Sequence, residues 1–424
     1  MTGWLVTGLV LLLSALGAPV FAVLGALSLW LFHGAGIDPA AVIIELYRLA
    51  SLPALIAIPL FTFAGFLLAE SKAPHRLLTL AESLAGWMPG GLAVVGLTSC
   101  AVFTAFTGAS GVTIIALGGL LHPMLLKQGY PERFTLGLLT CTGSLGLLFP
   151  PSLPIILYGL VAKVPIDKLF LAGAVPGLLL LAVLGAYGAF VGWRSSLPRT
   201  SFSAAAVLAA ARAAAWEVPL PFIIIGGIYG GKFTATDAAA VMAFYVFVVE
   251  VFIYRDVGFK DLPRIVRESM TLVGSILIVL GCALGLTNYM IDAEVPEALF
   301  AWLSRFVTSK VGFLAVLNVI LLVVNMVEIF SAIVIVVPII IPIAAQYGID
   351  PVHLGVIFLL NLEIGYMTPP LGLNLFLSNR RFGAPLPQLY RASFPFWLAH
   401  VAMLALVTYW PALSLSLVQW RNPG

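Results

Sequence analysis

The chain has 424 residues, of which 61% are hydrophobic and only 9% are charged, and its formal net charge at pH 7 is +3. Soluble globular domains carry about 25% charged residues, so this composition excludes that class and indicates an all-α polytopic membrane protein with roughly ten to twelve membrane segments. The small net charge is spread among short loops and does not indicate nucleic-acid binding. No phosphate-binding loop or other enzyme motif emerges, so we expect a protein that is not an enzyme and hydrolyses no ATP.

The first apolar run covers residues 1 to 32, lacks a basic leader and exceeds the length of a signal-peptide core. We therefore expect a retained first helix, with residues 1–50 forming an N-terminal scaffold helix and loop. Residues 51–193 are predicted to be a first repeat, made of a scaffold helix (51–71), an amphipathic arm (74–88), a hairpin (90–128), a broken helix (133–162) and a closing helix (168–193).

After linking scaffold helices at 194–268, the same order of elements recurs in a second repeat over 269–415. Its parts are a helix (269–291), an arm (295–309), a hairpin (310–348), a broken helix (352–379) and a closing helix (388–415), with a C-terminal tail at 416–424. The repeat rests on five Gly and Pro coincidences at a fixed offset of 219 residues. The pairs are Pro123 and Pro342, Gly129 and Gly348, Gly146 and Gly365, Pro150 and Pro369, and Pro151 and Pro370.

The two predicted hairpins are apolar segments of nearly forty residues with small and polar residues at their centres. These central clusters are "TAFTGASGVT" at 104–113 and "NMVEIFSA" at 325–332. Each flank has only about 15 to 17 residues, fewer than the roughly 20 that a full span needs. A re-entrant hairpin with its tip near the bilayer midplane is therefore favoured, and two full spans are the alternative.

Charge asymmetry predicts the orientation. Loops 72–76, 127–133, 194–217, 255–268 and 380–391 fall on one face and carry 14 of the 21 Lys and Arg residues. The basic-rich face is expected to be cytoplasmic, which places the N-terminus in the cytoplasm and the C-terminus in the periplasm. In this layout hairpin one opens to the cytoplasm and hairpin two to the opposite side, so the repeats are inverted.

Each broken helix contains a double proline, which removes two backbone donors and frees carbonyl groups one turn earlier. Irregular backbone at membrane depth is tolerated only where protein buries it or where it lines a cavity. Freed carbonyls and nearby hydroxyls suit a small cation, and a simple helix kink is the alternative. We expect no cofactor but two or more coupling Na⁺ ions, at site 1 (Thr107, Ser110, Gly146, Phe149, Pro150) and site 2 (Asn325, Met326, Gly365, Thr368, Pro369).

Ionisable residues within membrane segments are functional candidates. Glu328 lies at the second tip, where it either contacts substrate or ion or caps a hairpin helix, and Glu363 lies in the second broken helix with its role left open. Asn374 follows the second break and either faces the cavity or bonds to another helix. The predicted substrate contacts are Ser110, Glu328, Ser331 and Asn374.

Four stretches carry a family resemblance that extends over essentially the whole chain. They are "TGASGVTIIALGGLLHPMLLKQGY", "GLLFPPSLPIILYG", "VEIFSAIVIVVPIIIPIAAQYGIDPVHLGVIF" and "GYMTPPLGLNLF". The sequence resembles the large membrane subunit (M subunit, DctM-like) of tripartite ATP-independent periplasmic (TRAP) transporters. It departs from the family pattern at the first tip, where Ala109 replaces a hydroxyl residue, and at the second, where Glu328 stands at a position that is commonly Asp.

The resemblance implies an elevator-type, sodium-coupled importer in the bacterial inner membrane. Its substrate would be an organic acid, such as a C4-dicarboxylate or sialic acid, delivered by a periplasmic substrate-binding protein (P). It further implies a small membrane subunit (Q) as a separate chain, and membrane lipid around both. The alternatives are a stand-alone divalent-anion/sodium symporter and, more remotely, a membrane-embedded enzyme.

Overall fold

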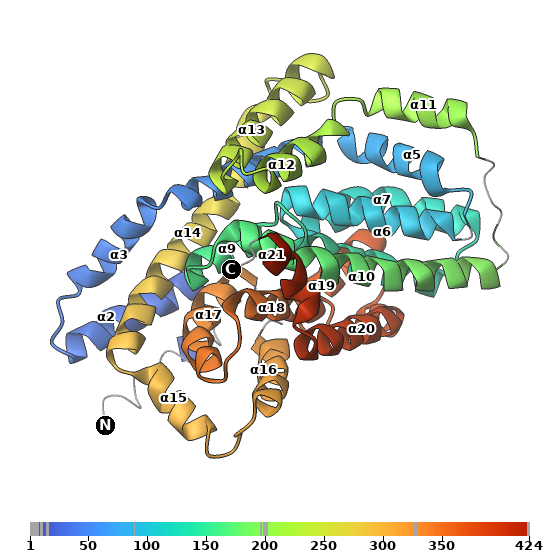
Figure 1. Ribbon diagram of the computed structural model, residues 1–424. Helices are drawn as coiled ribbons and strands as arrows, with labels where there is room; N and C mark the ends of the chain where they lie inside the picture. The colour runs from blue at the N-terminus through green and yellow to red at the C-terminus, as the bar shows by residue number, and fades with distance from the viewer. Residues whose placement is uncertain are drawn as a thin grey trace.

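A computed structural model describes residues 8, 12–13, 17–88, 90–195, 197, 202–324 and 329–421 (Figure 1). Every regular element in these ranges is a helix, so the all-α prediction is confirmed. Six of the described helices are long and apolar enough to cross a membrane, and a bent pair, 132–148 with 153–162, raises the number to seven. Several shorter apolar helices lie beside them, so the chain is a multi-pass membrane protein.

The two repeats contain matching helices. Repeat one consists of α4 (Ala57–Glu70), α5 (Ala73–Ala85), α6 (Gly91–Thr107), α7 (Ser110–Gln128), α8 (Glu132–Thr142), η2 (Leu145–Leu148), α9 (Leu153–Ala162) and α10 (Ile166–Arg194). Repeat two consists of α14 (Leu262–Asp292), α15 (Val295–Leu303), α16 (Lys310–Val324), α17 (Ile329–Gln346), α18 (Pro351–Tyr366), α19 (Leu373–Phe382) and α20 (Leu386–Tyr409). From α6 onward, matching helices begin 219 or 220 residues apart, so the offset seen in the sequence is an offset between structural elements.

Eight of the described helices lie outside the two repeats. They are α2 (Val20–Gly34), α3 (Ala40–Ala50), η1 (Pro53–Ile56), α11 (Ala204–Ala213), α12 (Pro219–Tyr229), α13 (Ala235–Phe247), the π-helical η3 (Val248–Ile253) and α21 (Ala412–Arg421). Helix α2 packs along α14, and α13 packs along α4. In Figure 1, α11 lies over the arm helix α5, and these two helices are in contact.

Two helix boundaries and two predicted loops differ from the predictions. The closing helix ends at Tyr409 and not at 415, because the following Trp410–Pro411 pair interrupts it and a separate helix, α21, occupies most of the expected tail. Residues 40–50 and 204–213, expected as loops, form α3 and α11. Helix α14 begins at Leu262, seven residues before the predicted start, with Pro263 in its first turn.

The first hairpin is a pair of antiparallel helices that remain in contact along their length. Gly108, at φ 65°, and Ala109 form the turn between α6 and α7, and glycine suits this left-handed conformation. The hydroxyls of Thr104 and Thr113 lie 2.6 Å apart across the hairpin. A Cβ on Gly96 would lie 3.4 Å from the side chain of Leu121, so the arms remain adjacent far from the tip. The arms have 17 and 19 residues, slightly more than the predicted flanks.

The two broken helices cross each other. Helix α8 of the first packs against α19 of the second, and α18 of the second packs against η2 and α9 of the first. Hydrogen bonds join them: Thr140 donates to Ser378 Oγ at 3.0 Å, and the Tyr158 hydroxyl donates to the Pro351 carbonyl at 2.8 Å. The first proline pair, Pro150 and Pro151, is buried by this packing, whereas the second pair, Pro369 and Pro370, is exposed.

Candidate functional site

The first hairpin tip packs directly on the first proline break. Thr107 ends α6 and Ser110 begins α7, while Thr104 Oγ1 donates a hydrogen bond of 3.1 Å to the carbonyl of Gly143, just before the break. A Cβ on Gly146 would lie only 2.4 Å from the Ala101 carbonyl oxygen and the Ala105 nitrogen. Only glycine permits this approach of backbone to backbone, so Gly146 is required for the tip and the break to meet.

Buried oxygen atoms concentrate at this contact. The exposed fraction is 0% for Thr107 and 3% for Ser110, and Thr107 Oγ1 has no hydrogen-bond partner among the described residues. The Gly146 carbonyl accepts a hydrogen bond of 3.1 Å from Phe149 N, which leaves one lone pair on that oxygen unused. Because buried polar atoms are nearly always satisfied, the unpartnered Thr107 hydroxyl is a candidate ligand. The structure brings the predicted site 1 residues together, and their role as ligands stays a prediction.

The second break repeats this backbone geometry with different side chains. The Gly365 carbonyl accepts from Thr368 N at 3.2 Å, as the Gly146 carbonyl does in the first repeat. Thr368 Oγ1 donates to the Ile364 carbonyl at 2.6 Å and accepts from Trp397 Nε1 at 3.0 Å. Its hydroxyl therefore keeps one lone pair for a further contact. Pro369 is exposed.

Three of the predicted residues at the second tip, Asn325, Met326 and Glu328, lie outside the described residues. Ser331 lies in the first turn of α17 and is buried. Asn374 is fully buried, and its Nδ2 donates to the Thr140 carbonyl at 3.0 Å, so its amide joins the two broken helices. The Asn374 Oδ1 atom has no hydrogen-bond partner among the described residues and remains available to a ligand.

A pair of matching cavities beside the breaks was missed by the sequence analysis. The cavity at the second break has a volume of about 240 Å³, and three aromatic residues of α20, Tyr390, Phe394 and Trp397, line it with the break itself. The cavity at the first break, of about 210 Å³, has Leu178 at the position matching Trp397. The sequence does contain a feature that predicts matching environments at the two breaks, because Pro176 and Pro395 extend the offset of 219 residues into the closing helices.

Glu363 is the most deeply buried carboxyl group near the crossing of the broken helices. Its exposed fraction is 0%, and neither carboxylate oxygen has a hydrogen-bond partner among the described residues. It precedes Met367 by one helical turn, and Met367 Sδ lies 3.5 Å from Cys141 Sγ in α8. Glu363 therefore lies on the face of α18 that packs toward the first broken helix.

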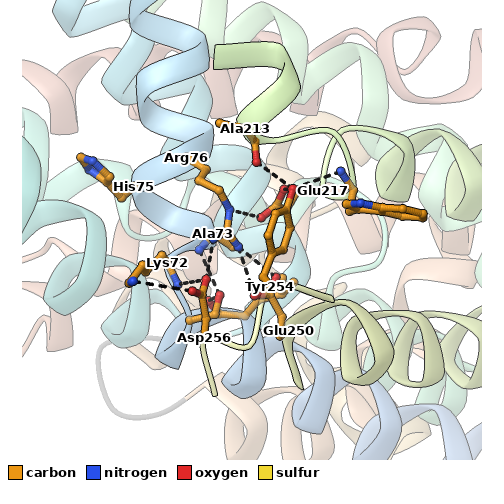
Figure 2. Close-up of polar contacts among 12 residues, drawn as sticks. Lys72, Ala73, His75, Arg76, Ala213, Glu217, Glu250, Tyr254 and Asp256 are labelled. Atoms are coloured by element: carbon orange, nitrogen blue, oxygen red, sulfur yellow. Dashed lines mark hydrogen bonds and ion pairs between the residues drawn. The ribbon is translucent and has the colours of Figure 1, made fainter. Parts of the chain in front are cut away.

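A separate ion network fastens the arm helix α5 to the linking helices (Figure 2). Arg76 forms ion pairs with Glu217, Glu250 and Asp256, and its guanidinium carbon lies 3.9 Å from the centre of the Tyr254 ring. Burial by itself would lower the pKa of the Arg76 guanidinium, but hydrogen bonds and charge from the three carboxylates outweigh burial and hold the pKa above its ordinary value. This network lies on the face predicted to be cytoplasmic.

One known protein family matches this chain over nearly all its length. The model of the DctM component of the tripartite ATP-independent periplasmic transporter matches residues 7–413. The chain belongs to the DctM family. The resemblance seen in the four sequence stretches is thereby confirmed, and so is the expectation that the chain is a transporter subunit and not an enzyme.

Relatives within the DctM family differ in what their names say they transport. The C4-dicarboxylate TRAP transporter large permease protein DctM of Pseudomonas aeruginosa is 37% identical over 93% of each chain. The ectoine/5-hydroxyectoine large permease protein UehC of Ruegeria pomeroyi is 32% identical over 86% of this chain and 85% of its own length. The isethionate TRAP transporter permease protein DctMQ of Oleidesulfovibrio alaskensis is 33% identical over 94% of this chain and 64% of its own length.

A solved structure supports the fold of this DctM-family chain. The YdaH transporter of Alcanivorax borkumensis superposes with a TM-score of 0.64, covering 89% of this chain and 88% of its own, at 14% identity. At that identity the likeness concerns the fold alone.

Proposed function

We propose that this chain is the membrane permease of a sodium-driven importer of an organic acid in the bacterial inner membrane. The observation that carries the proposal is the cluster of buried oxygen atoms at the first tip and break, in a chain that belongs to the DctM family. Hydroxyl and carbonyl oxygens are the ligands that hard cations prefer. The same backbone arrangement at the second break supports a second Na⁺ site, so two ions are proposed per cycle.

Two ions supply enough energy without ATP. A tenfold sodium gradient contributes about 1.4 kcal/mol per ion, and a membrane potential of about 100 mV contributes about 2.3 kcal/mol per net charge moved. Import of two Na⁺ with one monoanion is thus driven by about 5 kcal/mol, which corresponds to several thousandfold accumulation.

The substrate is proposed to bind between the two tips and the crossing of the broken helices. Ser110 and the free Oδ1 of Asn374 would contact it, together with Ser331 and Glu328 of the second tip. The names of relatives support an organic acid of the dicarboxylate or sulfonate kind, or the zwitterion ectoine. A periplasmic binding protein would deliver the substrate, and a small membrane subunit would complete the permease as a separate chain.

Reconstituted vesicles test the sodium sites. Ser110→Ala and Thr368→Ala each remove one proposed ligand, so each should raise the sodium concentration that gives half-maximal uptake. Thr98→Ala is the matched control, because the Thr98 hydroxyl, among the described residues, bonds only to the carbonyls of Val94 and Val95 in its own helix. A sodium response equal to that of the wild type in both variants would refute the assignment, and uptake without any binding protein would favour a stand-alone symporter.

An elevator movement is proposed for the hairpins and broken helices, with the linking helices and the scaffold helices α4 and α14 as the fixed frame. Helix α17 of hairpin two packs against α14 in the present conformation. A cysteine pair across this contact should trap the protein when oxidised and abolish uptake until it is reduced. Uptake that persists after complete crosslinking would mean that the hairpins only gate a fixed site.

A further inference from the structure

Helix α4, the scaffold helix of repeat one, belongs to the proposed fixed frame. It packs along α13 and α14, which lie outside the hairpins and broken helices. Its C-terminal residue, Glu70, forms an ion pair with Arg264 at the start of α14. At the other end, Thr236 at the start of α13 donates a hydrogen bond of 3.1 Å to the carbonyl of Pro53, the first residue of the short helix η1 that leads into α4. Both ends of α4 are therefore tied to the frame.

The middle of α4 touches the first hairpin tip. A Cβ on Gly65 would lie 2.5 Å from the Cα of Thr107 and 2.7 Å from the carbonyl oxygen of Phe106. Both neighbours are backbone atoms, so no rotation of a side chain could relieve the overlap. Glycine at position 65 is thus what allows the frame to approach the tip this closely.

This approach covers the candidate ligand at the tip. Thr107 is fully buried, and its hydroxyl has no hydrogen-bond partner among the described residues. Ala109 is the tip residue that keeps some exposure, while Thr107, Gly108 and Ser110 are buried. The helix that seals Thr107 from one side is a part of the frame and not of the hairpin that carries the residue.

We propose that α4 closes the first ion site in this conformation and that Gly65 is the positioning residue that permits the closure. Separation of α4 from the tip is then the step that opens the site to sodium. The inference rests on the proposed sodium coupling and adds the element that controls access to the first site. An added methyl group at position 65 holds α4 away from Thr107, so the site stays open and retains sodium poorly.

The test compares Gly65→Ala with Gly226→Ala in α12 and Gly274→Ala in α14. A Cβ at either control position meets no atom within 4 Å beyond its own helix, so all three variants gain the same helix propensity but only one creates an overlap. Each is made with Ala109→Cys as a reporter, in a background in which Cys100, Cys141 and Cys282 are replaced. Maleimide labelling of the reporter is measured with and without sodium, beside sodium-dependent uptake.

In the reporter background and in both controls, sodium should slow labelling several-fold, because the ion favours the closed tip. Gly65→Ala should label several-fold faster in sodium and should require several-fold more sodium for half-maximal uptake. The inference is overturned if the reporter in Gly65→Ala is labelled at the same rate as in the controls, even if the Gly65→Ala variant has a lower thermal stability. Should Gly65→Ala fail to fold, the reporter background still decides: labelling slowed by sodium supports closure of the tip, and labelling as fast with sodium as without it overturns closure.

The two proposals fail in different ways. If the labelling rate does not depend on sodium in any variant, and uptake does not depend on sodium either, the proposed sodium site itself is refuted. If uptake depends on sodium but Gly65→Ala labels at the same rate as the controls, the proposed sodium site stands and only the proposed role of α4 is refuted.

Discussion

Replacing Arg76 by methionine removes the cation at the centre of the network that fastens α5 to the linking helices. The Arg76 side chain has an exposed fraction of 12%, and its partners Glu217, Glu250 and Asp256 have 3%, 0% and 7%. Lys72 also pairs with Asp256, at 3.8 Å, but its side chain is 77% exposed and cannot replace the guanidinium. The variant therefore leaves three nearly buried carboxylates without their main counter-ion.

The expected cost follows from this burial. Removal of one partner from a buried ion pair destabilises a protein by about 3 to 5 kcal/mol, because an uncompensated charge stays buried. Arg264→Met is the matched control, since Arg264 is 42% exposed and pairs with Glu70 and Glu268 at 39% and 42% exposed. Exposed pairs of this kind contribute at most about 1 kcal/mol. The difference between the two variants should thus be at least about 2 kcal/mol.

Thermal unfolding of the purified protein in detergent measures the difference, with uptake as a second readout. Adding Glu217→Gln to Arg76→Met should restore part of the lost stability, because it removes one of the carboxylates that paired with Arg76. Equal losses in Arg76→Met and Arg264→Met, or no recovery in the double variant, would refute the idea that this buried network fixes the arm.

Three further predictions concern orientation and the breaks. A cysteine at Arg212, in the exposed segment between the repeats, should not react with an impermeant reagent added from the periplasm; reaction would reverse the orientation. Gly146→Ala should destabilise the protein by about 1 to 3 kcal/mol through overlap with α6, whereas Gly274→Ala should not, as thermal unfolding would show. Trp397→Phe removes a hydrogen bond to Thr368 and should cost about 1 kcal/mol; an unchanged melting temperature would contradict that bond.

Much of the fold followed from the sequence because its signals are local. Proline lacks an N–H and glycine reaches positive φ, so Gly129 and Gly348, or the two Pro-Pro pairs, mark the same breaks in both repeats whatever surrounds them. Apolar length likewise separates membrane helices from arms. The hairpins, the two broken helices and the family resemblance could therefore be inferred before any contact was known, whereas the crossing of the broken helices could not.

The tertiary structure decided which polar groups meet. The Asn374 amide donates a hydrogen bond to the Thr140 carbonyl of the other broken helix, and the Trp397 indole N–H donates one to the Thr368 hydroxyl. No pattern in the neighbouring sequence predicts either contact. The carboxylates around Arg76 are 141 to 180 residues away from it in the chain. Gly65 resembles any helical glycine until α4 is placed against Thr107. Such contacts depend on the packing of helices distant in sequence, and periodicity and composition describe only what each helix can do by itself.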